Sequence, residues 1–169
     1  MPRDLHERAE HYHPDVTITI TAAGPSDIPS LLASADALIR TDAGMFDAGA
    51  TNLAWATSGG PAYCAALVAG GDDFAILARD EDEVIGHLVG RQYGPNELHP
   101  ITTAELESIH VYPAHRGRGV GGLLASSFLE RVAAVDRVIV SAYAQNTRAL
   151  SFYARRGFEV RSVILDQDL

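Results

Sequence analysis

The sequence predicts an α/β protein in which a mixed sheet carries helices on its faces. Three observations support this prediction. Runs of β-branched residues alternate in character, segments with apolar residues at helical spacing lie between them, and turn-forming residues separate the two kinds of segment. The resulting order of elements along the chain is β-α-α-β-β-β-α-β-α-β, without an internal repeat or a low-complexity stretch.

The first half of the chain predicts a strand and two helices. Residues 16–21, which read VTITIT, alternate and are β-branched, so they predict a strand. Ser26 or Asp27 is placed to cap a helix over 28–40. A glycine-rich stretch that is expected to be a loop separates it from a second helix over 60–69, which begins with a proline and ends at a glycine pair.

The rest of the chain predicts the remaining strands and helices, again bounded by turn residues. An acidic turn, RDEDE, is expected to join the first two of these strands as a hairpin. In chain order the elements are strands over about 74–79, 84–91 and 103–111, a helix over about 119–133, a strand over 137–143, a short helix over 146–156 and a final strand over 158–165.

Composition favours one soluble domain over 16–169, preceded by a polar tail over 1–15. The net charge of -9 argues against a nucleic-acid binder, which usually carries a basic surface. Apolar runs fall far short of the roughly 20 residues of a membrane span, and the N-terminus has no signal-peptide core. The single cysteine, Cys64, excludes an internal disulfide. It is expected to be a buried packing residue and not a nucleophile. A cytoplasmic protein without nucleic-acid or membrane partners is expected.

The stretch RGRGVGGLL predicts an anion-binding loop. Four glycines within seven residues cost chain entropy, which suggests that a ligand must approach the backbone closely. Amide groups at a helix N-terminus carry partial positive charge, and Gly119, Gly121 and Gly122 have no Cβ to keep a phosphate away. Arg116 and Arg118 can add charge-assisted hydrogen bonds. The expected ligand group is a pyrophosphate.

Two nucleotide-binding loops were compared with this stretch. A P-loop requires a lysine, and the chain has none. A Rossmann dinucleotide loop is harder to dismiss, because Gly117, Gly119 and Gly122 spell G-x-G-x-x-G after a strand and before a helix. The acid expected about 20 residues later, at the end of the next strand, is missing, since Asp136 precedes that strand. A nicotinamide dinucleotide enzyme therefore remains the less favoured alternative.

Two motifs resemble those of the GNAT N-acetyltransferase superfamily. RGRGVG matches the pattern R/Q-x-x-G-x-G/A, and AQNTRALSFYARRGF at 144–158 is similar to N-x-x-A-x-x-F-Y-x-x-x-G-F. Together they cover roughly 105–158. The resemblance implies a GNAT-like mixed, mostly antiparallel central sheet flanked by helices, with splayed strands at about 103–111 and 137–143. A β-bulge commonly assists such splaying.

The resemblance also implies transfer of an acetyl group from acetyl-CoA, as co-substrate, to a primary amine in a ternary complex. The pantetheine arm would bond to the backbone of the first splayed strand, and the pyrophosphate would lie on the amides of the glycine stretch. The implied co-substrate-binding residues are Ile109, His110, Val111, Arg116, Gly117, Arg118, Gly119, Val120, Gly121, Gly122, Asn146 and Tyr153.

The candidate catalytic residues are a tyrosine and two glutamates. Tyr153 matches the family's proton donor to the leaving thiolate, and it shares a helix face with Asn146. Glu107 is the first candidate for the base, and Glu105 is the second. Strand alternation places both carboxylates on the face of Ile109 and Val111, with His110 on the opposite face.

The acceptor is expected to be a small-molecule or peptide amine, bound by the less diagnostic segments 40–62 and 92–102. Four aromatic residues lie in or near them: Phe46, Trp55, Tyr63 and Tyr93. The histidines show no metal-ligand spacing, so no metal is expected. A homodimer is possible by analogy with relatives. A non-catalytic acyl-CoA-binding sensor domain is the second alternative.

Overall fold

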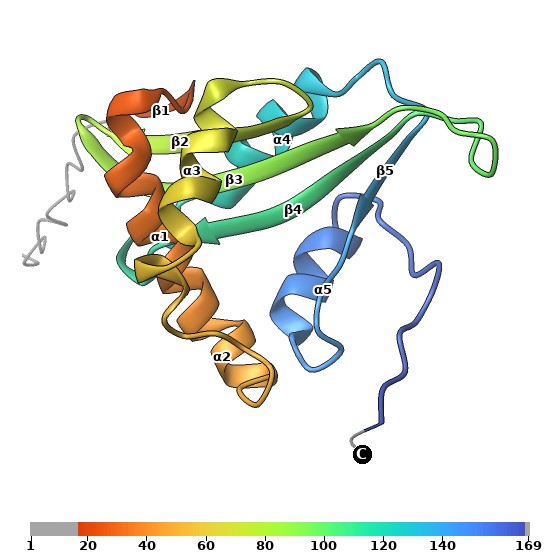
Figure 1. Ribbon diagram of the computed structural model, residues 1–169. Coiled ribbons are helices and arrows are strands. Elements are labelled where there is room, and N and C mark those ends of the chain that lie inside the picture. The colour runs from red at the N-terminus through yellow and green to blue at the C-terminus, as the bar shows by residue number, and fades with distance from the viewer. Residues whose placement is uncertain (1–16, 168–169) are drawn as a thin grey trace, which may run out of the picture.

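The computed structural model describes residues 17–167 and is built on one five-stranded sheet (Figure 1). The expected tail over 1–15 lies outside the described residues. The strands are β1 (Ile18–Ala22), β2 (Asp73–Asp80), β3 (Glu83–Tyr93), β4 (Thr103–Val111) and β5 (Arg137–Val140), in that order across the sheet. Each of the first four is antiparallel to its neighbours among them, and β5 runs parallel to β4. The predicted mixed, mostly antiparallel sheet is confirmed.

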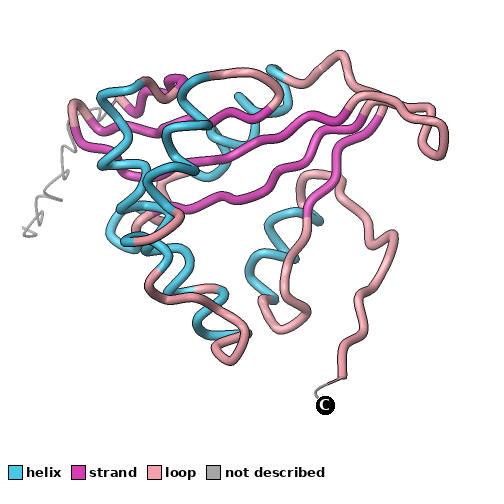
Figure 2. The backbone as a smooth tube through the Cα atoms, in the orientation of Figure 1, coloured by secondary structure: helices cyan, strands magenta, loops and turns pink. Residues whose placement is uncertain are grey.

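Helices cover both faces of this sheet (Figure 2). They are α1 (Ile28–Thr41), α2 (Ala43–Phe46), α3 (Gly60–Ala69), α4 (Val120–Arg131) and α5 (Thr147–Ala154), with short 3-10 turns at Pro25–Asp27, Trp55–Thr57 and Pro113–His115. On one face α1 and α3 pack through Leu31, Cys64 and Leu67. On the other, α4 packs through Leu124 and Phe128. None of the helices within 17–167 is long and apolar enough to cross a membrane.

Local sequence signals set most element boundaries. The helix predicted over 60–69 is confirmed, and it ends at Gly70, whose φ of +84° suits glycine. The hairpin between β2 and β3 turns tightly, because Asp80 pairs with Glu83 and Glu81 adopts a φ of +53°. Gly157, with a φ of +83°, ends the last helical turn. These positions confirm the expected boundaries at the hairpin and the two glycines.

Three predicted local features differ in the structure. The stretch expected to be a loop after α1 contains the short helix α2. Neither candidate cap bonds to the start of α1: the Asp27 carboxylate instead accepts the Gly24 N–H at 2.9 Å and pairs with Arg79. Strand β5 ends at Val140 rather than at 143. In the first two cases contacts with other parts of the chain override local preference.

The final strand predicted over 158–165 is wrong, because the structure has no regular secondary structure there. Its β-branched composition indicates a strand, yet strand propensity is expressed only where a neighbouring strand supplies hydrogen bonds and packing. Here the segment leaves the sheet (Figure 1), and Val160 and Ile164 are 83% and 90% exposed. Only Phe158, at its beginning, packs against the core.

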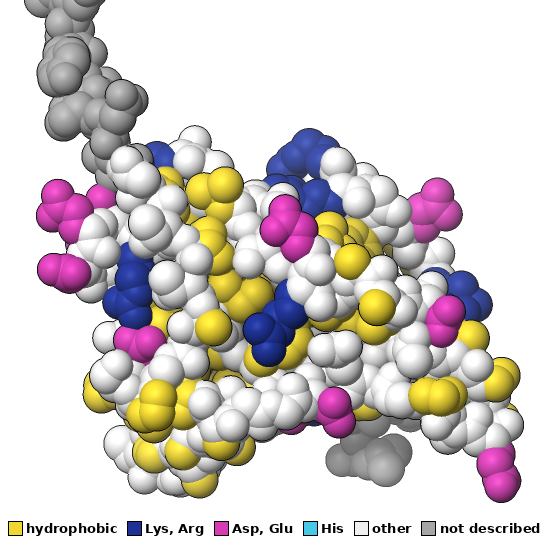
Figure 3. Space-filling view, turned by 90° about the horizontal axis from the view of Figure 1, so that it is seen from above, with side chains coloured by type: hydrophobic (Ala, Val, Ile, Leu, Met, Phe, Trp, Pro, Cys, Tyr) yellow, Lys and Arg dark blue, Asp and Glu magenta, His cyan; other side chains and the backbone are white. Residues whose placement is uncertain are grey.

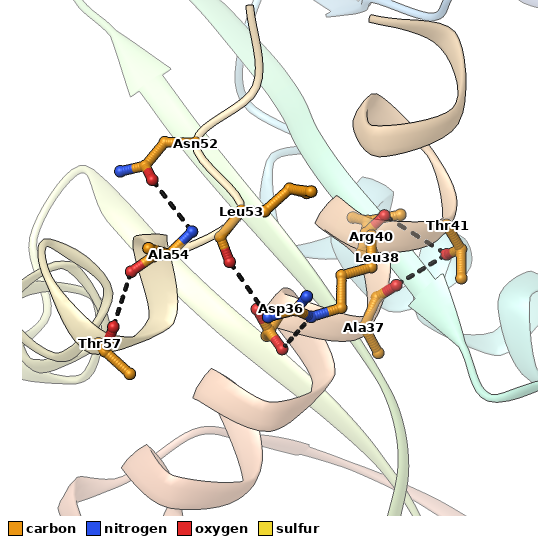
Figure 4. Close-up of polar contacts among 9 residues, drawn as sticks. All are labelled: Asp36, Ala37, Leu38, Arg40, Thr41, Asn52, Leu53, Ala54 and Thr57. Atoms are coloured by element: carbon orange, nitrogen blue, oxygen red, sulfur yellow. Dashed lines mark hydrogen bonds and ion pairs between the residues drawn. The ribbon is translucent and has the colours of Figure 1, made fainter. Parts of the chain in front are cut away.

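The connection between α2 and α3 is held to α1 by a polar contact (Figure 4). Arg40 pairs with Asp36 at 2.8 Å, one helical turn away, and donates to the Leu53 carbonyl at 3.1 Å. This contact ties the connection between α2 and α3 to the end of α1.

On the face seen in Figure 3, basic and acidic side chains are interspersed with apolar ones, and neither charge forms a single patch.

Candidate active site

The splay expected between β4 and β5 is present. The two strands pair from Thr103 with Arg137 to Leu106 with Val140. Beyond that point β4 continues to Val111, whereas the chain after β5 leaves the sheet. The outer edge of β4 over 107–111 therefore has no strand partner among the described residues, and it leads directly to the glycine stretch.

A β-bulge lies where the two strands separate. On β3, Val89 faces Ser108 and Gly90 faces Leu106, so Glu107 is the extra residue on β4. Gly90 is required at this position, because a Cβ there would lie 2.4 Å from the Phe74 ring. The bulge is therefore built into the packing of the core.

The bulge reverses the side-chain alternation that the sequence suggested. Ile109 and Val111 pack with Leu106 on the α4 side of the sheet, whereas Glu107 bonds to a tyrosine of α3 on the other side. The prediction that the two glutamates share a face with Ile109 and Val111 is thus wrong. One extra residue moves every later side chain to the opposite face.

Each glutamate is held by a tyrosine on the α3 side of the sheet. Tyr63 of α3 donates its hydroxyl hydrogen bond to Oε1 of Glu107, and burial, followed by this carboxylate, raises the pKa of Tyr63 well above its usual range. Tyr93 donates to Oε2 of Glu105 at 2.7 Å. Two of the four aromatic residues expected near an acceptor thus contact the candidate bases.

Arg91 was not singled out from the sequence, yet it completes this carboxylate cluster. Its guanidinium lies 3.0 Å from Oε2 of Glu107 and 2.8 Å from Oδ1 of Asp73. The hydrogen bond to Asp73, with further acceptors nearby, raises the pKa of Arg91. Beside it is an open cavity of about 440 Å³, lined by Ala66, Gly70, Asp72, Asp73, Arg91, Gln92 and Tyr93. Asp73, Arg91 and Tyr93 of the cluster thus line this cavity, whereas neither glutamate does.

The glycine stretch begins α4 in the way the motif predicts. Gly117 and Gly119 have φ values of +79° and +81°, which side chains rarely adopt. Gly119 immediately precedes α4, and no side chain caps the helix. The Gly119 carbonyl accepts a backbone hydrogen bond from the Leu123 N–H. The amides of Val120, Gly121 and Gly122 thus precede the intrahelical bonds, and Val120 contributes only backbone, because its side chain is in the core.

The last two glycines have a packing role as well. A Cβ on Gly121 would lie 3.3 Å from the Phe152 ring, and one on Gly122 would lie 2.8 Å from the Arg156 guanidinium. Both neighbours belong to α5 or its final turn. The group that approaches Gly121 and Gly122 closely is therefore, in part, a side chain of this protein and not only a ligand.

The two arginines of the motif have different partners. Arg116 donates from Nε to the Val111 carbonyl at 2.8 Å, which fixes the end of β4 against the loop. Arg118 pairs with Asp80 at 3.1 Å and also contacts His115. Arg116 therefore keeps the rest of its guanidinium for an anion, whereas Arg118 is held by the β2–β3 hairpin.

Tyr153 and Asn146 lie on α5 beside Asp42, which ends α1. Asn146 accepts the Ala149 N–H at 3.0 Å as the helix cap and donates to Asp42 at 2.7 Å. Tyr153 is 8% exposed. Burial, with the Asp42 carboxylate as the second cause, raises its pKa to about 12. The ring of Phe46 in α2 lies 5.6 Å from that of Tyr143, so α2 contacts the segment before α5.

A buried polar network escaped the sequence reasoning. Ser34 of α1 lies with Oγ 2.7 Å from Nδ1 of His87 and 3.1 Å from Nδ1 of His110. Burial lowers the pKa of His87 to about 3, with His110 as the second cause, and lowers that of His110 to about 4. His110 lies opposite Ile109 and Val111, as expected, but on the same side of the sheet as Glu107, because of the bulge; its side chain joins α1 to β3 and β4. The only signal in the sequence is a histidine in each apolar strand.

This network predicts acid-sensitive stability. The folded pKa values of His87 and His110 lie below the unfolded value of about 6.5, so between about pH 6.5 and 4 the unfolded chain binds protons that the folded chain excludes. Each histidine is expected to lower the free energy of unfolding by about 1.4 kcal/mol per pH unit over that range. Urea unfolding at pH 7 and pH 5 should show a smaller pH difference in His87→Gln than in His99→Gln, because His99 is exposed; equal differences contradict the assignment.

The structure thus combines a splayed strand pair, a glycine loop at a helix N-terminus and a buried tyrosine near the Asp42 carboxylate. The chain belongs to the acetyltransferase (GNAT) family, whose model matches residues 45–158. A mycothiol acetyltransferase from Mycolicibacterium vanbaalenii is 36% identical over 97 residues, which are 52% of this chain and 30% of that protein. The chain thus spans about a third of the length of this curated relative.

Solved structures share the fold at low identity. A transcriptional regulator from Bacillus halodurans superimposes with a TM-score of 0.72 at 18% identity, covering 90% of this chain and 100% of the other. An aminoglycoside acetyltransferase from an uncultured soil metagenomic sample has a TM-score of 0.68 at 17% identity, covering 92% and 98%. The arrangement of β4, β5 and the surrounding helices is therefore that of the family.

Proposed function

We propose that this protein transfers an acetyl group from acetyl-CoA to a primary amine of a small molecule or peptide by direct attack in a ternary complex. The observation that carries the proposal is the unpaired edge of β4 over 107–111, which leads into an uncapped helix N-terminus. Membership of the GNAT family and the name of the Mycolicibacterium relative support acetyl transfer. The acceptor and the use of acetyl-CoA belong to the proposal.

The residues present fit acetyl-CoA. The outer edge of β4 over Ile109, His110 and Val111 is open to the pantetheine arm, because no strand pairs with β4 there; the Val111 carbonyl already accepts from Arg116. The amides from Gly117 to Gly122, with Arg116, suit a pyrophosphate. When bound, acetyl-CoA supplies the acyl group as an activated thioester.

Proton transfer is assigned to side chains on either side of the splay. Tyr153 holds its proton at neutral pH because its pKa is raised to about 12, so it can donate to the leaving thiolate. Glu107 is the proposed base, since it lies at the point where the strands part. Tyr63 and Arg91 already engage its two oxygens, which favours action through a water molecule. Glu105 is the alternative base.

Ligand-dependent thermal unfolding tests the proposal. Acetyl-CoA at about 100 times its Kd should stabilise the fold by about 2.7 kcal/mol, or roughly 5 to 11 °C in Tm for a domain of this size. NADH at the same concentration is the control for the dinucleotide alternative. A shift with NADH alone, or with neither ligand, contradicts the proposal. A shift with acetyl-CoA but no CoA release across a panel of primary amines favours the non-catalytic sensor.

A further inference from the structure

The arginines of the described part of the chain differ in whether they pair with a carboxylate. Arg40, Arg79, Arg91 and Arg118 do so. Arg116, Arg137 and Arg156 are half-buried and lie in no ion pair of the described residues, and of these Arg156 lies against the start of α4. Taking a cation out of water without a carboxylate partner is unfavourable. Its position therefore indicates an anion that comes from outside the chain.

Arg156 is held in a fixed position against the start of α4. Its guanidinium lies 3.7 Å above the Phe152 ring and donates to the Phe152 carbonyl at 3.2 Å. The Phe152 ring itself lies against Gly121, and the guanidinium approaches Gly122 so closely that a Cβ there would be 2.8 Å away. A planar guanidinium stacked on an aromatic ring is pre-organised, so little conformational entropy is lost when it binds.

Two sources of positive potential meet at this place. They are the Arg156 guanidinium and the amides that precede the intrahelical bonds of α4. Arg116 lies on the other side of the loop, bonded to the end of β4. Burial, followed by the nearby Arg148 charge, lowers the pKa of Arg116, and burial lowers that of Arg156. A lowered pKa of each arginine is what is expected of a partly buried cation without a negative partner. In the pattern N-x-x-A-x-x-F-Y-x-x-x-G-F, position 156 is one of the unspecified positions, so the motif itself does not assign Arg156 a role.

We propose that Arg156 is a phosphate-binding residue of the co-substrate site and sets its affinity for the pyrophosphate of acetyl-CoA. This inference rests on the proposed function. Charge-assisted hydrogen bonds to a phosphate are among the strongest available to an arginine. The adjacent helix amides favour the pyrophosphate over the separate 3′-phosphate, because both groups of donors lie at the first turn of α4.

Calorimetric titration of the full chain tests the assignment. The Arg156→Met variant keeps the side-chain stem over Phe152 and removes the charge. It should raise the Kd of CoA by about 10-fold or more, and it should raise the Kd of 3′-dephospho-CoA by the same factor. The Kd of acetyl-pantetheine, which has no pyrophosphate, should not change. The matched control is Arg155→Met, since Arg155 is exposed, adjacent and equally charged.

The other outcomes overturn specific statements. Equal CoA affinity in Arg156→Met and Arg155→Met refutes the inference while leaving the proposed function intact. A loss seen with CoA but absent with 3′-dephospho-CoA refutes the pyrophosphate assignment. Weaker acetyl-pantetheine binding, or a Tm of Arg156→Met that falls without ligand, shows a packing role instead. If the unmodified chain binds no CoA, the proposed function fails before Arg156 is tested.

Discussion

Replacing Tyr153 with Phe is expected to reduce kcat for acetyl transfer by about 100-fold, the lower end of the usual contribution of a positioned acid. The Kd of acetyl-CoA should change little. The ring remains in the core and keeps its contacts with Phe152 and Phe158, at 5.3 and 5.8 Å between ring centres. Only the hydroxyl is lost, so the substitution separates proton donation from packing.

A change of pH cannot replace this substitution. Because the pKa of Tyr153 is raised to about 12, the phenol stays protonated throughout the range in which the protein is expected to be folded. Steady-state CoA release and acetyl-CoA titration of the same variant give the two quantities required. Tyr112→Phe removes a phenol from a residue just after β4 and serves as the control. Undiminished turnover of Tyr153→Phe at every pH tested contradicts the assignment of the acid.

The parts of the fold that were predictable are those fixed by neighbours in the sequence. The helix over Gly60–Ala69 and the strand over Thr103–Val111 have the predicted bounds, because a proline, a glycine pair and a β-branched run act locally. The bulge at Glu107 depends on the packing of Gly90 against Phe74, which no local pattern records. The segment after Phe158 has strand composition but no pairing partner among the described residues.

The site divides in the same way. The glycine loop and Tyr153 could be located because each lies in a continuous motif. Partners of the glutamates could not, since Tyr63 is 44 residues from Glu107 and meets it only through the packing of α3 on the sheet. Arg91 reaches the same carboxylate from β3. The motif residues could therefore be placed from the sequence, whereas the contacts of Glu105 and Glu107 depend on how distant segments pack.

Replacing Glu107 with Gln is expected to lower kcat, and with it kcat/KM for the amine, by about 100-fold. Glutamine keeps an oxygen that can accept the Tyr63 hydroxyl, and Arg91 keeps its bond to Asp73. The substitution thus removes the carboxylate with little change in the surrounding contacts. The measurement is the rate of CoA release over a range of amine concentrations, which gives kcat and KM separately.

Glu105→Gln is the matched comparison, because Glu105 lies two residues away and is also held by a tyrosine. If Glu105→Gln alone lowers kcat, the base is Glu105. Unaltered kcat in both variants contradicts both assignments and leaves bulk water as the proton acceptor. An increase in KM with kcat unchanged means that the carboxylate only binds a cationic amine. Measuring kcat and KM separately distinguishes these cases, because an interaction made equally in the ground state and the transition state changes KM alone.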